Sequence, residues 1–281
     1  MAVKIVTDSL SDITSDIAEK FGITVVPLTV LFGHETYLDR VTITTDEFYR
    51  RLVQGTVWPT TTQPTPQAFA DVYNKLAEET DEILVVTLSS KLSGTYESAT
   101  SAKTMVKKKC RIEVIDSKTV AMGLGLIVIS AAKAVQKGAR LNEVTDLVKR
   151  GMGRSHFIAY FDTLKYLAKG GRIGMAQGLV GSLLSVKPLL TVKEGQMAPL
   201  TRVRSLAAGL DYLYNFVAGY ANRIEELAVE HTTTRDEADK LAERMSAIFP
   251  ERIYRSTVSP VLGVYGGPGA IAVTVLEAEK R

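Results

Sequence analysis

The sequence predicts an α/β protein with two α/β domains, the first built on a mainly parallel sheet flanked by helices and the second on a mixed sheet with helices. The chain has 281 residues, which is room for two domains of ordinary size. In its first half, short β-branched runs alternate with amphipathic stretches, a pattern typical of parallel strands joined by crossover helices. Its second half contains a strand, turn and strand sequence that predicts an antiparallel hairpin.

In the first half, strands are predicted where apolar and β-branched residues run together, at residues 3–7, 24–32, 83–88 and 112–115. Helices are predicted at residues 16–21, between residues 44 and 55, and at residues 66–79, 94–106 and 120–136. Start and stop residues support these limits: Ser15 as an N-cap, Gly22 as a stop, Thr44 with Glu47 as a capping box, Pro66 in a first turn, and Gly55 and Gly138 as stops.

A further helix is predicted from Asn142, as its cap, to about Lys149, and Gly151 and Gly153 are the best candidates for a domain joint. We therefore expect an N-terminal domain at residues 1–152 and a C-terminal domain at residues 153–281. In the second domain, strands are predicted at residues 157–161, 188–192, 197–203, 253–258 and 270–276, with a turn at 194–195. Helices are predicted at residues 206–220 and 235–249, the second with Thr234 and Glu237 as a capping box.

Composition excludes several classes of protein. With 46% hydrophobic and 23% charged residues, the chain resembles ordinary globular proteins and not disordered ones. The apolar stretch at residues 121–129, which extends to residue 132, is far shorter than the ~20 residues of a membrane span. Asp8, Asp12 and Asp16 stand where a secretory signal needs a basic start and an apolar core, so we expect a cytoplasmic protein. Cys110 is the only cysteine, which excludes intrachain disulfides and a multi-cysteine zinc site.

The charge distribution says more than the net charge of +3, which does not indicate a nucleic-acid partner. Residues 151–204 contain eight Lys or Arg against two acidic residues, and the rest of the chain is acidic on balance. A basic middle segment suggests that an anionic ligand, partner or surface meets this part of the protein, through an attraction that salt screens. For any single one of these cations, a solvated surface charge is the ordinary alternative.

Two hydroxyl-rich loops, at residues 59–66 and 89–95, each lead into a predicted helix. The second loop follows the apolar strand that ends near Leu88, the end of a parallel strand where open α/β sheets place ligands. Unpaired N–H groups at a helix start, together with hydroxyl donors, suit an oxyanion or a carboxylate. Ser and Thr are also ordinary caps and turn residues, and for one loop alone that interpretation comes first. With two such loops in one domain, a carboxylate cradle and ordinary capping are about equally favoured.

Two glycine clusters, at residues 169–174 and 263–269, allow a close approach of backbone to a ligand or simply form tight loops. Arg172 stands between glycines of the first cluster, where a guanidinium can make a planar, bidentate contact to a carboxylate or phosphate. A solvated charge at a helix end is the alternative, and the sequence leaves both open.

The motifs of several enzyme classes are absent. The sequence has no G-x-x-x-x-G-K-[ST] phosphate loop and no G-x-S-x-G nucleophile elbow, and its three histidines have no paired spacing for a metal. Asp8 and Asp116 each follow a predicted strand, where a carboxylate can serve a metal or a base, but Asp before a helix is first a capping residue. The sequence assigns neither of them a role and predicts no catalytic residue, no metal and no cofactor.

In order along the chain, several motifs resemble those of the DegV family of bacterial fatty-acid-binding proteins. They are Thr7-Asp8-Ser9, Pro-Thr-Thr-Thr-Gln-Pro at 59–64, Leu-Ser-Ser-Lys-Leu-Ser-Gly-Thr-Tyr at 88–96, Ile-Asp-Ser-Lys at 115–118, Thr-Leu-Lys-Tyr-Leu at 163–167, Gly-Gly-Arg-Ile-Gly at 170–174, Lys187-Pro188 and the Gly-Pro-Gly at 267–269. The resemblance covers the whole length of the chain. It implies two DegV-like α/β domains that enclose one long-chain fatty acid, such as palmitate.

The resemblance also implies roles for residues. Thr61 and Ser93 would hydrogen-bond the carboxylate, with Thr62 and the backbone N–H of Gly94 close by, and Arg172 would lie near the ligand exit and engage a kinase or its phosphate. The chain departs from the family at Tyr265, which stands where members usually have a histidine in Gly-x-His-x-Gly-Pro-Gly. A phenol can still donate one hydrogen bond, so Tyr265 is a candidate head-group contact.

The expected function is therefore a non-catalytic, cytoplasmic lipid-binding subunit. It would present the carboxylate of a bound fatty acid to a separate ATP-dependent fatty acid kinase and carry the acyl phosphate onward to lipid metabolism. An anionic membrane surface is a further expected transient contact. The runner-up is a phosphotransfer or hydrolytic enzyme of small molecules that uses Asp8, Asp116 and the hydroxyl loops, and a third hypothesis is a regulatory interaction protein.

Overall fold

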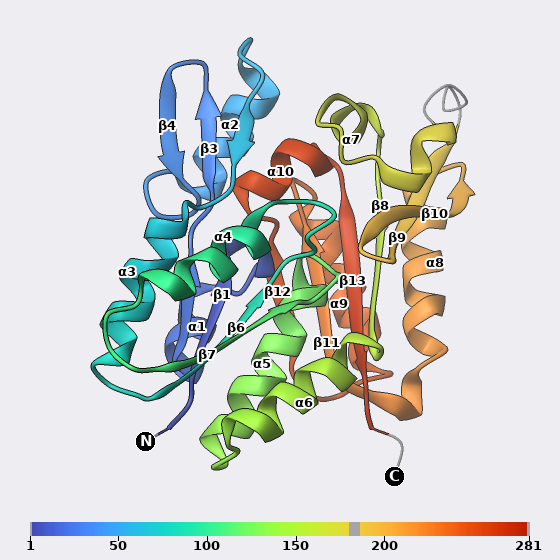
Figure 1. Ribbon diagram of the computed structural model, residues 1–281. Helices are drawn as coiled ribbons and strands as arrows, with labels where there is room; N and C mark the ends of the chain where they lie inside the picture. Colours follow the sequence, from blue (N-terminus) through green and yellow to red (C-terminus); the bar gives the residue numbers. More distant parts are fainter. Residues whose placement is uncertain (1, 180–185, 280–281) are drawn as a thin grey trace.

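The computed structural model describes residues 2–179 and 186–279 and has two main sheets with helices between and around them (Figure 1). Its parallel sheet has the order β2-β1-β6-β7. The strands are β1 (Lys4–Asp8), β2 (Ile23–Val26), β6 (Glu82–Thr87) and β7 (Arg111–Asp116). The helices of this part are α1 (Ser15–Phe21), α3 (Pro66–Ala77) and α4 (Thr95–Ser101), which a 3₁₀ turn at Ala102–Met105 follows. The predicted α/β class of the first half is confirmed.

Alternation along the strands gives the parallel sheet two apolar faces. Val6, Ile83 and Val85 pack against α3 and α4, in one cluster with Phe69 and Tyr73. The alternate residues of the same strands point to the other face, where they join the larger core that continues into the second half of the chain. Both faces are buried, which explains why residues 83–88 form a continuous apolar run.

A small antiparallel sheet stands beside the parallel sheet and corrects two predictions. Its order is β4-β3-β5, with β3 (Thr29–Phe32), β4 (Glu35–Leu38) and β5 (Thr60–Thr62), and α2 (Thr45–Gln54) joins β4 to β5. The single strand predicted at residues 24–32 is therefore wrong: the chain breaks at Pro27, which has no N–H to donate, and the N–H of Leu28 bonds to Ser9 Oγ instead. The loop at residues 59–66 contains β5, which the sequence did not indicate.

The second half of the chain forms a six-stranded mixed sheet with the order β10-β9-β8-β13-β11-β12. Its strands are β8 (Ser155–Tyr160), β9 (Lys187–Lys193), β10 (Gln196–Val203), β11 (Ile224–His231), β12 (Ile253–Thr257) and β13 (Ile271–Glu277). The helices α8 (Leu206–Ala218) and α9 (Arg235–Ser246) cover its outer face. The predicted hairpin is confirmed as β9 and β10. The strand β11 was missed, because Glu226 and Glu230 interrupt its apolar pattern.

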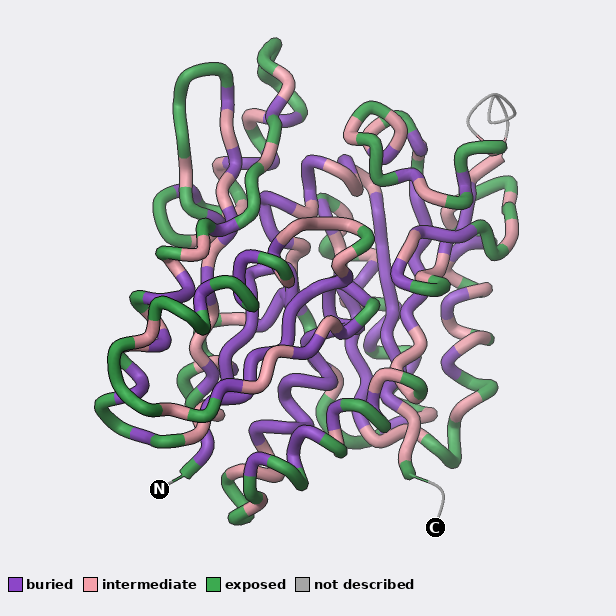
Figure 2. The backbone as a smooth tube through the Cα atoms, viewed as in Figure 1, coloured by how far each residue is buried: buried purple, intermediate pink, exposed green. Residues whose placement is uncertain are grey.

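Two helices lie between the sheets and connect them. They are α5 (Met122–Gln136) and α6 (Leu141–Met152). Every residue of α5 from Met122 to Ala132 is buried, because both sheets and α6 surround this helix (Figure 2). The long apolar stretch of the sequence is thus a central helix of the core. The domain boundary at residue 152 stays a prediction, and the outer limits, residues 1 and 281, lie outside the described part of the chain.

Several helix ends differ from the predictions. Ser15 is the first residue of α1 and Thr14 is its N-cap residue. The helix α6 begins one residue before Asn142 and runs through Gly151 to Met152, so Gly151 does not end it. Thr234 donates its hydroxyl to the carbonyl of Ala270 and does not cap α9. Gly22 ends α1 with a φ of +65°, as predicted. Of the predicted capping box at α2, the Thr44 half is confirmed, since its hydroxyl accepts from the N–H of Glu47, whereas the Glu47 carboxylate binds Arg50 instead.

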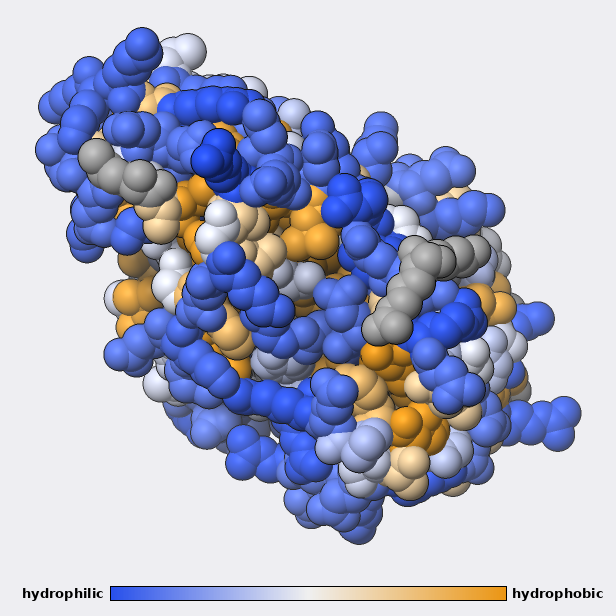
Figure 3. Space-filling view, turned by 90° about the horizontal axis from the view of Figure 1, so that it is seen from below, coloured by the Kyte–Doolittle hydropathy of each residue, from blue (hydrophilic) through white to orange (hydrophobic). Residues whose placement is uncertain are grey.

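Two short helices were not predicted, α7 (Lys165–Lys169) and α10 (Pro260–Gly266). Both lie in or beside the glycine clusters, whose composition favours loops. The remaining 3₁₀ turns are Ser9–Ser11, Gly174–Leu179 and Ala221–Arg223. Within the described part of the chain, no helix combines the length and apolar character needed to cross a membrane. Seen from below, the surface is mostly hydrophilic, with apolar residues showing in separate groups between (Figure 3).

Candidate functional site

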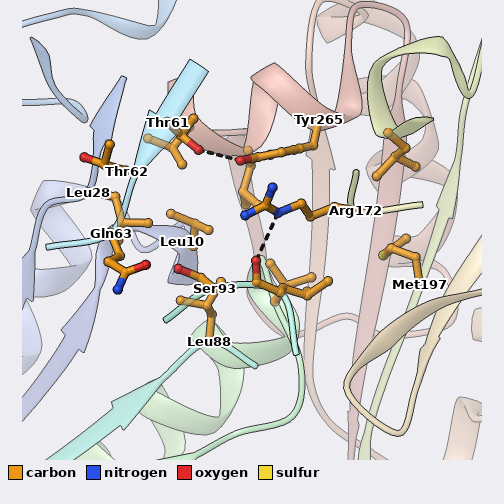
Figure 4. A pocket seen from close by; sticks show the side chains of 15 residues that line it. Leu10, Leu28, Thr61, Thr62, Gln63, Leu88, Ser93, Arg172, Met197 and Tyr265 are labelled. Atoms are coloured by element: carbon orange, nitrogen blue, oxygen red, sulfur yellow. Dashed lines mark hydrogen bonds between the residues drawn. The ribbon is translucent and has the colours of Figure 1, made fainter. Parts of the chain in front are cut away.

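A cavity of about 250 Å³ lies where the two halves of the chain meet (Figure 4). It is lined by Leu10, Leu28, Thr61, Thr62, Gln63, Leu88, Leu92, Ser93, Val120, Leu167, Arg172, Met197, Val261, Leu262 and Tyr265. In the first half, these residues come from β5 and from the segments that follow β1, β2, β5, β6 and β7. In the second half, they come from α7 and the turn after it, from β10 and from α10. The site therefore forms only when both halves of the chain are folded against each other.

Asp8 holds two of the apolar lining residues in place. Its carboxylate accepts hydrogen bonds from the N–H of Leu10 at 3.0 Å and from the N–H of Leu88 at 2.8 Å. Asp8 is completely buried, and this burial raises the pKa of its carboxyl to about 7 although the two N–H donors act in the opposite direction. The side chain that the sequence left unassigned thus caps the turn after β1 and ties it to the end of β6.

Asp116, the other unassigned carboxylate, has a similar structural role. It accepts hydrogen bonds from the N–H of Ser90 at 3.1 Å, from the hydroxyl of Ser90 at 2.6 Å and from the N–H of Lys118 at 2.9 Å. These contacts fix the loop that carries Ser93. Among the described residues, no group of three or more His, Cys, Asp and Glu side chains is arranged to hold a metal ion.

The polar end of the cavity is made of neutral hydroxyl groups from distant parts of the chain. The hydroxyls of Thr61 and Tyr265 lie 2.5 Å apart, and those of Ser93 and Thr95 lie 2.9 Å apart. Thr61 is held by β5, in which it pairs with Val30 of β3. These oxygens can donate hydrogen bonds to an anionic group without adding a competing charge.

Arg172 reaches the same end of the cavity. Its Nε donates to the carbonyl of Leu92 at 3.2 Å and its Nη1 to the carbonyl of Gly170 at 2.9 Å. Figure 4 shows the guanidinium group directed between Tyr265 on one side and Ser93 on the other. The resemblance to known proteins implied that Arg172 lies near the ligand exit, and the structure places it on the wall of the cavity.

The glycine cluster at residues 169–174 makes room for Tyr265. A Cβ atom on Gly170 would lie 2.4 Å from Cδ1 of the Tyr265 ring, so a side chain there would displace the ring. The guanidinium carbon of Arg172 lies 5.3 Å from the centre of the same ring, within the range of a cation–π contact. Tyr265 is thus held by packing on α7 and its following turn as well as by Thr61.

Gln63 is a lining residue that the sequence did not single out, although it stands in the quoted Pro-Thr-Thr-Thr-Gln-Pro loop. Its side chain covers Gly94, where a Cβ atom would lie 2.4 Å from Gln63 Nε2. Among the described residues that line the cavity, Thr61, Thr62, Ser93, Arg172 and Tyr265 are present and Gly94 is not. The predicted contact of the Gly94 N–H with a ligand stays a prediction.

A second cavity, of about 80 Å³, adjoins the first and is lined mostly by apolar side chains. Both cavities share the walls formed by Val120, Leu167, Met197, Leu262 and Tyr265. Beyond these shared walls the second cavity reaches the inner face of the mixed sheet, where Ala159, Ala270 and Ala272 leave space that larger side chains would fill. The two cavities together offer a polar end and an apolar end, which suits a molecule with one anionic head and an apolar tail.

A basic and aromatic surface lies on α7 and the loop before β5. Its residues are Trp58, Lys165, Tyr166 and Lys169, and we call it the basic rim. Trp58 stacks on Tyr166 with ring centres 4.9 Å apart, and the ammonium group of Lys169 lies 3.8 Å from the centre of the Trp58 ring. Tyr166 in turn packs against Gly267 at the end of α10, next to Tyr265. The basic segment of the sequence therefore brings exposed cations beside the polar end of the cavity.

Comparisons with known proteins agree along the whole chain. A sequence model of the family described as uncharacterised protein, DegV family, matches residues 2–278. A DegV domain-containing protein of Caldanaerobacter subterraneus subsp. tengcongensis is 38% identical over 279 residues, with 96% of this chain and 97% of that protein covered. A DegV domain-containing protein of Clostridium perfringens is 36% identical over 278 residues, with 97% of this chain and 98% of that protein covered.

Solved structures show the same fold. A DegV family protein from Thermus thermophilus, described by its fatty acid binding, has 30% identity and a TM-score of 0.90, covering 99% of this chain and 100% of that one. DegV from Bacillus subtilis, described as a fatty acid binding protein, has 28% identity and a TM-score of 0.91, with 98% of each chain covered. A stearic acid-binding protein from Eubacterium ventriosum has 26% identity and a TM-score of 0.90, also with 98% of each chain covered.

Proposed function

Since this chain belongs to the DegV family, we propose that it binds one long-chain fatty acid in the two adjoining cavities. The carboxylate lies at the polar end, among the hydroxyls of Thr61, Ser93 and Tyr265 and the guanidinium of Arg172. The tail lies in the apolar part and continues past Met197 over the alanines of the mixed sheet. The observation that carries this proposal is the direct connection of a hydroxyl-lined end to a buried apolar cavity.

The tail supplies most of the affinity in this proposal. Each buried methylene contributes about 0.8 kcal/mol, so a tail with about 14 of them offers on the order of 11 kcal/mol before the costs of binding. One neutral hydrogen bond contributes only about 0.5 to 1.5 kcal/mol. The head-group contacts therefore mainly fix the orientation of the acid, with the carboxylate toward the basic rim.

Several donors are needed because a buried carboxylate without hydrogen bonds costs several kcal/mol. Thr61, Tyr265 and Ser93 supply hydroxyl donors, and Arg172 supplies a charged one, which makes shorter and stronger bonds. Thr62 also lines the cavity and is a further candidate donor. In the family pattern a histidine stands at the position of Tyr265, so this chain replaces an imidazole by a phenol, which can donate one hydrogen bond.

We further propose that the protein presents the carboxylate to a separate ATP-dependent fatty acid kinase and carries the acyl phosphate onward to lipid metabolism. The basic rim supports this step, since exposed Lys165 and Lys169 beside the head group attract an anionic phosphate or partner surface. An anionic membrane is a second surface that the same cations suit. A cytoplasmic location belongs to the proposal because the partner uses ATP.

The proposal assigns the chain no catalytic residue. Asp8 and Asp116, on which the alternative of a phosphotransfer or hydrolytic enzyme depends, hold loops together by hydrogen bonds with backbone N–H groups. Asp8 has no exposed surface through which a substrate could reach it. These contacts favour the binding function over the enzyme.

Lipid extraction tests the proposed function. The protein is purified and its lipids are extracted and identified by mass spectrometry, and the delipidated protein is then offered a mixture of long-chain acids. We expect a co-purified acid or stoichiometric uptake of an offered one. A protein that carries no acyl chain and takes up none would contradict the proposal. Addition of the kinase subunit and ATP to the loaded protein, with hydroxylamine to trap acyl phosphate, tests the second step separately.

A further inference from the structure

A third cavity, of about 310 Å³, touches the apolar cavity at one shared residue and has a lining of polar and apolar residues. Its lining residues are Ser117, Lys118, Thr119, Met152, Gly153, Ser155, Phe157, Val192, Glu194 and Gly195. Phe157 lines both this cavity and the apolar one. It is the lining residue that the two have in common within the described part of the chain, so the two cavities meet at Phe157.

The chain holds Phe157 firmly at this position. Phe157 lies in β8, paired with Thr274 of β13, and its carbonyl accepts the hydroxyl of Thr191 from β9 at 2.7 Å. Alternation along β8 directs Phe157 and Ala159 to the inner face, whereas Ile158 belongs to the cluster on the outer face. The strand therefore places a large ring next to a small side chain on the same inner face.

The helix α5 lies opposite Phe157 and makes room for its ring with a glycine. Gly123, in the first turn of α5, faces Phe157: a Cβ atom on Gly123 would lie 3.5 Å from Cβ of Phe157 and 2.4 Å from Thr119 Oγ1. Phe157 is 7% exposed, so its side chain is buried where β8 and α5 meet.

We propose that Phe157 is the end wall of the acyl cavity and limits the length of the fatty acid that fits. This inference rests on the proposed function and names the residue that selects among its substrates. On the near side of the ring, the terminal methyl group of the tail contacts alanines and the ring itself. On the far side, the lining combines the polar Ser117, Lys118 and Glu194 with the apolar Met152 and Val192, which a longer tail reaches only if the ring is removed.

Replacing the ring by a methyl group would join the cavities of about 80 and 310 Å³. In the Phe157→Ala variant, the tail of a longer acid would enter space that the Phe157 ring blocks in the wild-type protein. A fully buried methylene changes affinity by about fourfold, so an acid longer by two methylenes should gain at most about fifteenfold relative to the acid that the wild type prefers. Ala272→Val, on the floor of the apolar cavity, should act in the opposite direction and favour shorter acids.

The experiment is a competition series of saturated acids from laurate to behenate on delipidated protein. Wild type, Phe157→Ala, Phe157→Leu and Ala272→Val are compared, and circular dichroism confirms that each variant is folded. Phe249→Ala is the matched control, because it removes a ring of equal size from the cluster on the outer face of the mixed sheet. Phe157→Leu leaves a smaller opening. If Phe157→Ala does not fold, the same comparison is made with Phe157→Leu.

We expect the preferred length to increase in Phe157→Ala, to increase less in Phe157→Leu, to decrease in Ala272→Val and to stay unchanged in Phe249→Ala. An unchanged preferred length in folded Phe157 variants that bind fatty acid would overturn the inference and leave the proposed function standing. If the wild-type protein binds no acid of the series, the proposed function itself fails, and the inference fails with it.

Discussion

The hydroxyl oxygens of Thr61 and Tyr265 lie 2.5 Å apart, although 204 positions separate the two residues in the chain. This contact joins β5 of the first half to α10 of the second, and it lies on the wall of the cavity that we assign to the head group. The polar end of the site is therefore an interface between the two halves. Its donors are in place only when α10 is packed on α7 and against β5, and this gives the following predictions.

Removing the phenolic hydroxyl should weaken fatty acid binding modestly. In Tyr265→Phe the ring still fits against Gly170, but one hydrogen bond to the carboxylate is lost, so affinity should fall about two- to twelvefold. Isothermal titration calorimetry with one long-chain acid measures the change. Tyr166→Phe is the control, since it alters a neighbouring ring that does not line the cavity in the described residues. Equal affinity of Tyr265→Phe and wild type would exclude Tyr265 as a head-group ligand.

The two hydroxyl loops should act together on the carboxylate. Thr61→Val and Ser93→Ala should each lower affinity about two- to twelvefold, and the double variant should lose more than either. The exposed Thr60 of the same strand is outside the cavity lining, so Thr60→Val is a control for changes in β5. Isothermal titration calorimetry with one long-chain acid measures these affinities. A double variant that binds like wild type would remove these loops from the site.

Arg172 should contribute more to binding than any single hydroxyl, because its hydrogen bonds are charge-assisted. Arg172→Gln should lower affinity about ten- to a hundredfold and reduce the dependence of binding on salt concentration. Arg202→Gln changes an exposed cation of the same basic segment that does not line the cavity, and it serves as the control. The resemblance to the DegV family implied that Arg172 acts in the kinase step instead: unchanged binding with slower phosphorylation would support that role and contradict the one proposed from the cavity.

Stability should fall between about pH 4 and about pH 7 because buried carboxyls keep their protons in the folded state. Burial raises the pKa of Asp39 to about 7 from an ordinary value of 3.8, against the opposing effects of the Ser9 hydroxyl and the Arg40 charge. In this range the unfolded chain has already lost the proton that the folded chain holds. The free energy of unfolding therefore falls by up to about 1.4 kcal/mol per unit of pH for each such group. Above the folded pKa the loss is complete and stability no longer changes for this reason.

Asp39→Asn removes this titration, while Asn keeps an oxygen that accepts the Ser9 hydroxyl. Urea unfolding at about pH 5 and about pH 8 should show a smaller loss of stability in the variant than in wild type. Part of the loss should persist, because burial raises the pKa of Asp8 to about 7 as well. Asp46→Asn is the control, because it removes an exposed carboxylate instead of a buried one. A pH-dependent loss as large in Asp39→Asn as in wild type would contradict the prediction.

The sequence predicted the elements whose burial is visible in their own residues. The strand at 83–88 and the helix α5 are continuous apolar runs because sheets or helices cover them on all sides. The strand β11 was missed because its burial depends on partners far away in the sequence: Glu226 pairs with Lys133 of α5, and Glu230 accepts the N–H of Met122. From the sequence alone an acidic side chain is expected to be exposed, because the partner that stabilises it in the interior is not yet known.

The site was predictable to the extent that its residues stand in dense local patterns. The hydroxyl loops supplied Thr61, Thr62 and Ser93, and the glycine cluster drew attention to Arg172. Gln63 and Met197 have no such signal, because they line the cavity only through the packing of one half of the chain on the other. Tyr265 was noted as a departure from a family pattern, since it stands in the glycine cluster at residues 263–269, where α10 ends and where the composition favours a loop.

The proposed binding mode places the carboxylate of a long-chain fatty acid at the hydroxyl-lined end of the cavity and its tail in the apolar part. Calorimetric titration of the delipidated protein with a long-chain acid and with its methyl ester distinguishes this mode from others. We expect one acid bound per chain and markedly weaker binding of the ester, which cannot accept the same charge-assisted hydrogen bonds. No binding of the acid, or equal binding of acid and ester, would contradict it.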